Sequence, residues 1–422
     1  NNARVDEAIS LFEKAVVLPE YKEKSALCLS YLYSHLGKPE LSSRYFGEFF
    51  DSSKDPYPAL YAMWGEDGVA GNRGYREAYQ VELLKKLEAD PRNKSRLLAG
   101  TLYVLHMSEF MKYNSKAAYE YSSRIKNIED WMMVGPFDNT MNSGFDKDFG
   151  PLNQPEDQTV FKSKYGADVQ WFVPKHKSKD GYTLKHLYFN SNNSIVFAQT
   201  FVQSEIERDL LLKFGYSGSL KLWLNDSLIY EESEHRETEM DYYTYKVRLN
   251  KGYNRILVQL GDFEEEYANF TLRLTDMDHN AFIRPCETSF KPYTKGIKLA
   301  ERQTFFATQA LTENYKNSGS ILAGLLLAKA YRRSGEIYKA EEILKELLVI
   351  APKNFFVLRE LVLLFSNAKD NTNQNKYYDT FQELYPEDHD ILRNKIADYI
   401  KKQQKELAKS TYKTYIEKYP NV

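Results

Sequence analysis

The stretch ILAGLLLAKAYRRSGEIYKAEEILKELLVIAPKN, residues 321–354, decides the fold of the C-terminal part of the chain. Its apolar residues recur with the spacing of two helices, and Gly335 interrupts the run between them. Pro352 follows the second helix, and Pro386 and Pro420 continue the same spacing of 34 residues (352 to 386 to 420). A fixed period of this length indicates a helix–turn–helix unit that buries its apolar faces by stacking on its neighbours.

Thirty-four residues is the period of the tetratricopeptide repeat. In that register the positions that require large apolar, small, aromatic and turn residues hold Leu327, Ala328, Tyr331, Gly335, Ala340 and Leu344. Two more degenerate repeats, 355–388 and 389–422, keep the register with Phe365, Tyr378, Tyr399, Ala408 and Tyr412. We expect these side chains to pack in the core, and we expect peptide binding to involve polar residues on the concave face. A helix over 297–315 is predicted to precede the array.

Residues 4–130 also have helical spacing. A repeat that starts near Glu23 carries Leu29, Ser30, Tyr33 and Gly37 at the expected positions, and a helix pair is predicted over 95–113 and 115–128. We therefore predict a second tetratricopeptide-like array at the N-terminal end of the chain.

From about residue 129 the apolar period changes from 3.6 to 2, which predicts strands. Turn residues, including Gly215–Gly218 and Asn225-Asp226, separate the strand-like runs. These runs are 158–163, 168–173, 184–189, 194–203, 210–214, 220–224, 228–230, 243–249, 256–260 and 270–274. Many short antiparallel strands indicate a jelly-roll sandwich. The predicted fold is thus a multidomain α and β protein, with a helical array over 1–130, a β-sandwich over 131–283 and a helical array over 284–422.

Two segments of the predicted sandwich, LWLNDSLIY (222–230) and YKVRLNKGYNRILVQL (245–260), resemble galactose-binding-like modules of glycosidases and cell-surface proteins. The motif Trp131-x-x-x-Gly-Pro-Phe-Asp-Asn139, followed by Gly144-Phe145-Asp146, is similar to one in cell-envelope proteins of the Bacteroidetes. In that family tetratricopeptide repeats flank such a sandwich, and a transglutaminase-like domain often follows. The resemblance implies a periplasmic or cell-surface protein of a Gram-negative bacterium. We expect a removed leader before Asn1, and a further domain or a partner covering the repeat that ends at Pro420.

Bulk composition excludes several classes of protein. The 57 basic and 59 acidic residues give a net charge of −2, which argues against a nucleic-acid-binding surface. No apolar run is long enough to span a membrane. The two cysteines, Cys28 and Cys286, provide neither a disulfide framework nor a metal-binding pair.

Two sets of residues are candidate ligand sites. Trp171 and Trp223, with Trp131, could stack on a sugar ring, although core packing is the favoured interpretation for each. Asp276, Asp278, Asn280 and Glu287 have the spacing of calcium ligands. Against a calcium loop, Ala281 stands where the turn requires glycine and Pro285 interrupts the loop, so an interdomain turn is favoured. We expect no cofactor, with a structural calcium ion left open.

No nucleophile, phosphate-binding or metal motif occurs in the setting that its chemistry requires. The acidic residues around His389 are attributed to the first turn of a helix rather than to a metal site. We therefore expect a non-enzymatic interaction scaffold that binds protein partners through its helical repeats. Two alternatives are a glycan-binding module on helical arms and the non-catalytic N-terminal half of a transglutaminase-like enzyme.

Overall fold

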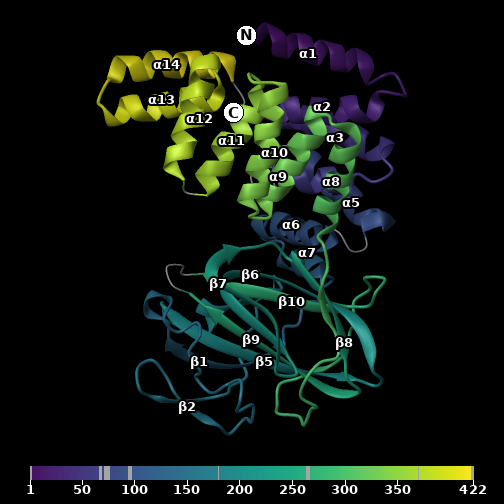
Figure 1. The fold of residues 1–422 in the computed structure, drawn as a ribbon, viewed down its shortest axis with the longest axis vertical. Coiled ribbons are helices and arrows are strands. Elements are labelled where there is room, and N and C mark those ends of the chain that lie inside the picture. The colour runs from purple at the N-terminus through teal and green to yellow at the C-terminus, as the bar shows by residue number, and fades with distance from the viewer. Residues whose placement is uncertain are drawn as a thin grey trace. The chain divides into compact units, whose positions relative to one another are not determined.

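The computed structural model describes residues 2–65, 69–70, 77–93, 97–178, 180–262, 267–368 and 370–419. Helical segments flank a central antiparallel β-sheet region, as predicted (Figure 1). The chain divides into two compact units. The helical unit comprises Asn1–Leu87 together with Phe306–Val422, and the sheet unit comprises Glu88–Phe305.

The helical unit is built from antiparallel helix pairs. Its N-terminal helices are α1 (Asn2–Ala15), α2 (Lys22–His35), α3 (Pro39–Ser52), α4 (Tyr57–Met63) and α5 (Ala78–Ala89), the last of which reaches its boundary. Its C-terminal helices are α8 (Phe306–Ser318), α9 (Ile321–Arg333), α10 (Ile337–Ile350), α11 (Phe355–Asn367), α12 (Asn371–Leu384), α13 (His389–Lys401) and α14 (Lys405–Lys418). Side chains of Ser320, Asn354, Asp370 and Asp388 cap the N-termini of α9, α11, α12 and α13.

The repeat register correctly predicts most of this packing. Leu327, Ala328, Ala340 and Leu344 are each at most 1% exposed, and Gly335 ends α9 with a φ of 70°. Pro352 and Pro386 follow the ends of α10 and α12, while Pro420 lies outside the described residues. Tyr412 is an exception, because 54% of it is exposed although the register predicts that it packs.

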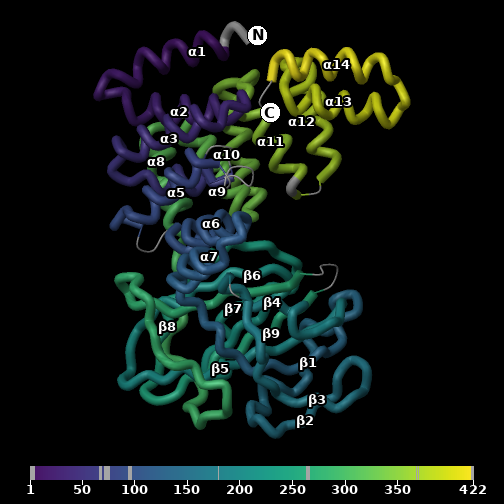
Figure 2. The backbone as a smooth tube through the Cα atoms, turned by 180° about the vertical axis from the view of Figure 1, so that it is seen from behind, coloured from purple at the N-terminus to yellow at the C-terminus, as the bar shows by residue number. Residues whose placement is uncertain are grey.

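The N-terminal and C-terminal helices pack together within the helical unit. α4 contacts α8 and α9, and both views of the backbone place α2 and α3 beside α8 to α10 (Figures 1 and 2). α2 is buried along its length from Ser25 to His35, apart from Cys28, which is half-buried. A helix buried on all sides requires the apolar and small residues found in SALCLSYLYSH (25–35).

The sheet unit contains two helices and the whole antiparallel sheet. The helices are α6 (Leu98–Met111) and α7 (Ser115–Ser122), and a small hairpin is formed by β2 (Val160–Lys162) and β3 (Asp168–Gln170). The ten strands of the main sheet are β1 (Met132–Asp138), β4 (Thr183–Leu184), β5 (Ser194–Ser204), β6 (Arg208–Leu224), β7 (Ser227–Glu237), β8 (Tyr243–Leu249), β9 (Gly252–Gly261), β10 (Asn269–Thr275), β11 (Cys286–Glu287) and β12 (Ala300–Arg302).

The long strand β6 organises the sheet. Its first half pairs with β8 and β10, and its second half pairs with β7 and β9, so that the strand belongs to both parts of the sheet. The predicted turn at Gly215–Gly218 is therefore wrong, because the strand continues through it. Gly215 is needed since a Cβ there would lie 1.9 Å from the carbonyl oxygen of Glu239, and Gly218 lies at a break in the β6–β7 register.

Two apolar clusters lie on opposite faces of the sheet. The larger one contains Leu210, Leu212, Leu222 and their neighbours in the strands. The other contains Phe137, Phe161 and those side chains of β5 and β9 that point away from the first cluster. The segment between β1 and β5 thus acts as a cover over one face of the sheet.

Three predicted elements differ from the structure. The helix predicted over 297–315 starts only at Phe306, because Ala300–Arg302 pairs with β8 as β12. The strand predicted over 184–189 is reduced to β4 followed by a 3-10 turn, and Lys185 turns inward to an ion pair with Asp262. The strand predicted over 168–173 ends at Gln170.

Candidate functional site

The contact between α2 and the C-terminal helices is the most elaborate polar arrangement in the helical unit. The ring of Tyr31 lies 4.5 Å from that of Phe356, and the Lys329 Nζ lies 4.8 Å from the Tyr31 ring centroid. The Tyr31 hydroxyl donates a hydrogen bond of 3.3 Å to Glu360. A helix from one end of the chain is thus bound by aromatic and ionic contacts from the other end.

Glu360 is the centre of that arrangement. Its carboxylate lies 2.8 Å from Lys329 Nζ and 3.1 Å from Arg332 Nε. The side chains of Glu360 and Lys329 are only 1% and 2% exposed. Burial by itself raises the pKa of Glu360, but the charges of Lys329 and Arg332 outweigh it and lower the pKa to about 2. The carboxylate therefore stays ionised inside the unit.

A second polar contact joins the end of α2 to the start of α13. His35 Nε2 lies 3.1 Å from Asp388 Oδ2, and the two side chains are 6% and 1% exposed. The ring of His389 lies 5.2 Å from that of His35. Burial lowers the pKa of His389, and the nearby carboxylates of Asp390 and Asp388 only partly oppose it. Asp388 also caps α13, as expected for an acidic residue at a helix start.

The sheet unit has its own buried charge at Arg255 of β9, which is 0% exposed. Its guanidinium donates hydrogen bonds to Gln199 at 2.9 Å, to Asp226 at 2.9 Å and to the carbonyl oxygens of Pro151 and Leu152. The turn residue Asp226 also accepts from the Tyr293 hydroxyl. One side chain thereby holds a strand, a turn and the covering segment together.

Lys213 of β6 is a second buried charge on the sheet. It is 2% exposed, and its Nζ has no hydrogen-bond partner among the described residues. It lies opposite Arg273, whose guanidinium is ion-paired with Asp241. Burial lowers the pKa of Lys213 to about 8, and Asp241 opposes this shift. A buried ammonium group without a hydrogen bond costs stability.

We expect Lys213→Met to raise the free energy of unfolding of the sheet unit by about 1–3 kcal/mol at pH 7, because it removes a desolvated charge and keeps the apolar stem. The folded-state pKa is depressed, so the cost is fully present below about pH 8 and fades as pH rises toward the ordinary lysine value of about 10.4. Urea unfolding followed by tryptophan fluorescence measures the gain. Lys246→Met on the neighbouring strand β8 is the control; an unchanged or lower stability for Lys213→Met contradicts the prediction.

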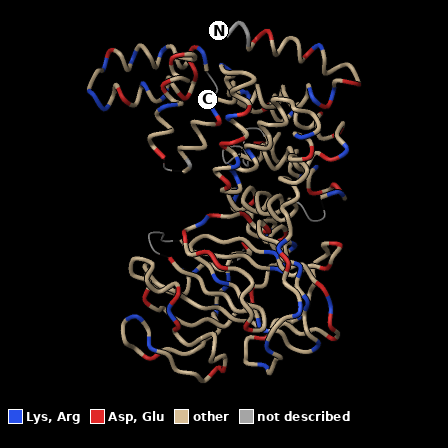
Figure 3. The backbone as a smooth tube through the Cα atoms, viewed as in Figure 1, with Lys and Arg blue, Asp and Glu red and all other residues tan. Residues whose placement is uncertain are grey.

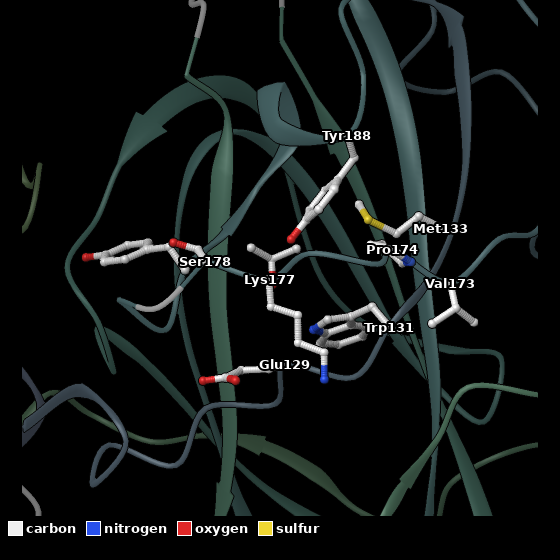
Figure 4. A pocket seen from close by; sticks show the side chains of 10 residues that line it. Glu129, Trp131, Met133, Val173, Pro174, Lys177, Ser178 and Tyr188 are labelled. Atoms are coloured by element: carbon white, nitrogen blue, oxygen red, sulfur yellow. The ribbon is translucent and has the colours of Figure 1, made fainter. Parts of the chain in front are cut away.

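A small pocket lies beside the start of the sheet, where Trp131, Lys177 and Tyr188 converge and Glu129 lies at the edge (Figure 4). Burial raises the pKa of both Glu129 and Tyr188. The cavity volume is about 10 Å³, which is room for about one water molecule. The pocket therefore does not provide space for a sugar or a peptide side chain.

The tryptophans proposed as sugar-stacking residues are buried in the two apolar clusters. Trp171 and Trp223 belong to the same apolar cluster and are 7% and 8% exposed. The Trp171 ring makes an edge contact with Phe161 at 6.2 Å. Trp131 is 2% exposed and packs against Phe270 in the other cluster. These positions favour the packing interpretation that the sequence already suggested.

The proposed calcium ligands lie on different elements. Asp276 accepts hydrogen bonds from the backbone and side-chain nitrogens of Asn280, which closes a tight turn after β10. Glu287 lies on β11, which pairs with β5, and is ion-paired with Lys291. Asp278 is an exposed residue of the turn. The described residues contain no group of three or more His, Cys, Asp or Glu side chains arranged to hold a metal ion.

No sequence pattern predicted a site at Tyr31, His35, Glu360 or Lys329. The local sequence indicates a buried charge only at Glu360, which stands among apolar residues in the helix FFVLRELVLLF (355–365). Its partner lies 329 residues away, so the contact has no local signature.

Charge is evenly mixed over the chain. Lys and Arg are interspersed with Asp and Glu in both units (Figure 3). In the part of the chain that the structure describes, every helix is too short or too polar to cross a membrane.

Comparison with known proteins gives little further guidance. No family model and no curated protein matches the chain. Among solved structures, it is similar to an anti-sigma factor domain-containing protein from Clostridium clariflavum, at 15% identity. The match covers 40% of this chain and 49% of that chain, with a TM-score of 0.23. A similarity at this TM-score carries no argument about fold or function.

Proposed function

We propose that the protein is a non-enzymatic interaction scaffold of a bacterial cell envelope, whose tetratricopeptide-like helices bind protein partners. The stacked helix pairs α9–α10 and α11–α12 and the 34-residue register support this proposal. The helical unit already binds a helix of its own chain, α2, against α9 and α11 through Tyr31 and its partners. In this proposal, the sheet unit is a galactose-binding-like jelly roll that serves as a rigid module.

The observation that carries the proposal is an exposed strip on α10. Tyr338 is 87% exposed and Val349 is 83% exposed. They are three helical turns apart, so they lie on one face of α10 with Glu342 and Lys345 between them. Large apolar side chains that flank two charged side chains are suited to bind an amphipathic segment of a partner protein. α2 covers the face formed by α9 and α11, which leaves α10 as the proposed contact surface.

Site-specific photocrosslinking in the full chain tests the proposal. A photoreactive residue at Tyr338 should give a discrete crosslinked product in envelope extracts, whereas one at Tyr165 of the sheet unit, which is 70% exposed, should not. Val349→Asp should lower the yield at Tyr338 at least tenfold without changing the circular dichroism spectrum. No product at Tyr338, together with turnover of a peptide or glycan by the purified protein, contradicts the scaffold function.

A further inference from the structure

The α13–α14 pair is joined to the other helices at the N-terminus of α13. The two helices lie side by side in both views (Figures 1 and 2). Asp388 Oδ1 caps α13 by accepting a hydrogen bond of 3.0 Å from the Asp390 backbone nitrogen, and Oδ2 lies 3.1 Å from His35 of α2. Arg359 of α11 lies 3.5 Å from the Asp390 carboxylate. The start of α13 thus contacts α2 and α11 through charged groups.

Two imidazoles share this buried place. The Nδ1 atoms of His35 and His389 have no hydrogen-bond partner among the described residues, and the His389 Nδ1 lies 3.3 Å from an Asp390 oxygen without hydrogen-bond geometry. The ring of Tyr419, which follows α14, lies 5.7 Å from that of His389. Nearby, Glu387 and Lys418 form an ion pair whose charges cancel. Arg393 of α13 lies 3.0 Å from the Asp390 Oδ1. The groups at the imidazoles are therefore Arg359, Arg393, Asp388, Asp390 and Tyr419.

The formal charges of the carboxylates and guanidiniums around His35 and His389 determine whether a proton is tolerated there. Asp388 and Asp390 contribute two negative charges, and Arg359 and Arg393 contribute two positive charges, so the cluster is neutral when both imidazoles are uncharged. An imidazolium at His389 leaves a net positive charge, with its ring centroid 5.2 Å from that of His35. A charge without a counter-charge is costly where little solvent reaches it.

The direction of the pH effect follows from His389. Burial lowers its pKa when α13 is docked, and exposure returns it to its ordinary value of about 6.5. The undocked state therefore binds more protons below about pH 6.5, and docking weakens as the pH falls. Burial by itself raises the pKa of Asp388, but the contact with His35 and the nearby charges outweigh it and lower the pKa. The contribution of Asp388 to the docking of α13 is therefore lost only at much lower pH.

We propose that His35, Asp388 and His389 form a pH-sensitive latch, which holds the start of α13 against α2 and α11 at neutral pH and releases it when His389 is protonated. The latch is independent of any partner, because all of its groups belong to the helical unit. Its expected consequence is that the α13–α14 pair undocks under mild acid while the preceding helices stay folded.

Hydrogen exchange of the full chain between pH 7.5 and 5.0, corrected for intrinsic exchange rates, tests the latch. Protection of amides in 389–401 should fall about tenfold per pH unit below about pH 6.5, as one proton is taken up on opening. Protection in α9 (Ile321–Arg333) should stay constant. An unchanged protection in α13, or an equal fall in α9, overturns the proposal. The pH profile of the wild-type chain is therefore a sufficient test without any variant.

A variant assigns the effect to His389. His389→Gln should remove the pH dependence of α13 protection, since its amide cannot take up a proton. A merely structural role would lower protection equally at every pH and leave the slope unchanged. His106→Gln is the matched control, because His106 is 5% exposed and lies in the sheet unit with its Nδ1 2.8 Å from the Ala118 carbonyl oxygen. Loss of the slope in His106→Gln contradicts the latch.

Discussion

Glu360→Gln should lower the free energy of unfolding of the helical unit by about 3–5 kcal/mol, because it leaves the buried charge of Lys329 facing a neutral amide. Lys329 and Arg332 both contact the lost carboxylate, at 2.8 Å and 3.1 Å. The substitution should also weaken the Tyr31 hydrogen bond that joins α2 to α11, since a neutral amide oxygen is a poorer acceptor than a carboxylate. Urea unfolding followed by circular dichroism at 222 nm reports on this unit, since most helices belong to it.

The pH dependence gives an independent check on Glu360. Its pKa is about 2 in the folded protein, below the ordinary value of about 4.3, so its contribution is fully present above the ordinary value. The contribution is lost as the pH falls through that window toward 2, and Glu360→Gln should lack this part of the acid sensitivity. Glu406→Gln, whose side chain is 86% exposed beside Lys409, is the control and should change stability by about 1 kcal/mol or less. A similarly small change for Glu360→Gln would refute the interpretation.

Arg255→Met should destabilise the sheet unit by about 3–5 kcal/mol, because the partly buried carboxylate of Asp226 and the carbonyl oxygens of Pro151 and Leu152 lose a charged donor together. Arg255→Lys should restore little of this loss, since an ammonium group cannot reproduce the planar array of donors. Tryptophan fluorescence during urea unfolding measures the effect. Three of the four tryptophans lie in this unit. Trp171 belongs to the segment that Arg255 holds, and Trp223 packs in the same cluster beneath it.

The matched control is Arg248→Met. Arg248 is 39% exposed and pairs with Asp209 on the outside of the sheet, so we expect a change of about 1 kcal/mol or less. Equal losses in the two variants would show that the burial of Arg255 does not matter.

The sequence predicts local features of this fold better than distant ones. Leu327, Ala340 and Leu344 are placed correctly because helical period and turn glycines are local signals. Gly215 misled the prediction, since its role is to admit the backbone of Glu239, which a strand pattern cannot show. The buried side chains of Glu360 and Arg255 were missed for the same reason, because their partners lie far away in the sequence.

For the candidate sites, too, the sequence predicts local features better than contacts between distant residues. Alternation in β6 indicated that Trp223 faces one side of the sheet, and packing was favoured for it, as its burial supports. The His35–Asp388 contact had no such indication, because each residue alone suits an ordinary helix end. The acidic residues around His389 were attributed to a helix start, where Asp388 is the cap, whereas the contact of Asp388 with His35 depends on how α2 packs.

The burial of α2 between helices from both ends of the chain has a consequence during synthesis. Tyr31 emerges from the ribosome 329 residues before Glu360, with which it forms its hydrogen bond. At about 5–20 residues per second, this interval lasts roughly 15–65 s. Throughout it, the apolar surface of α2 lacks its final cover while the whole sheet unit is being made. A nascent chain of this protein is therefore expected to need a chaperone for α2 until its last helices arrive.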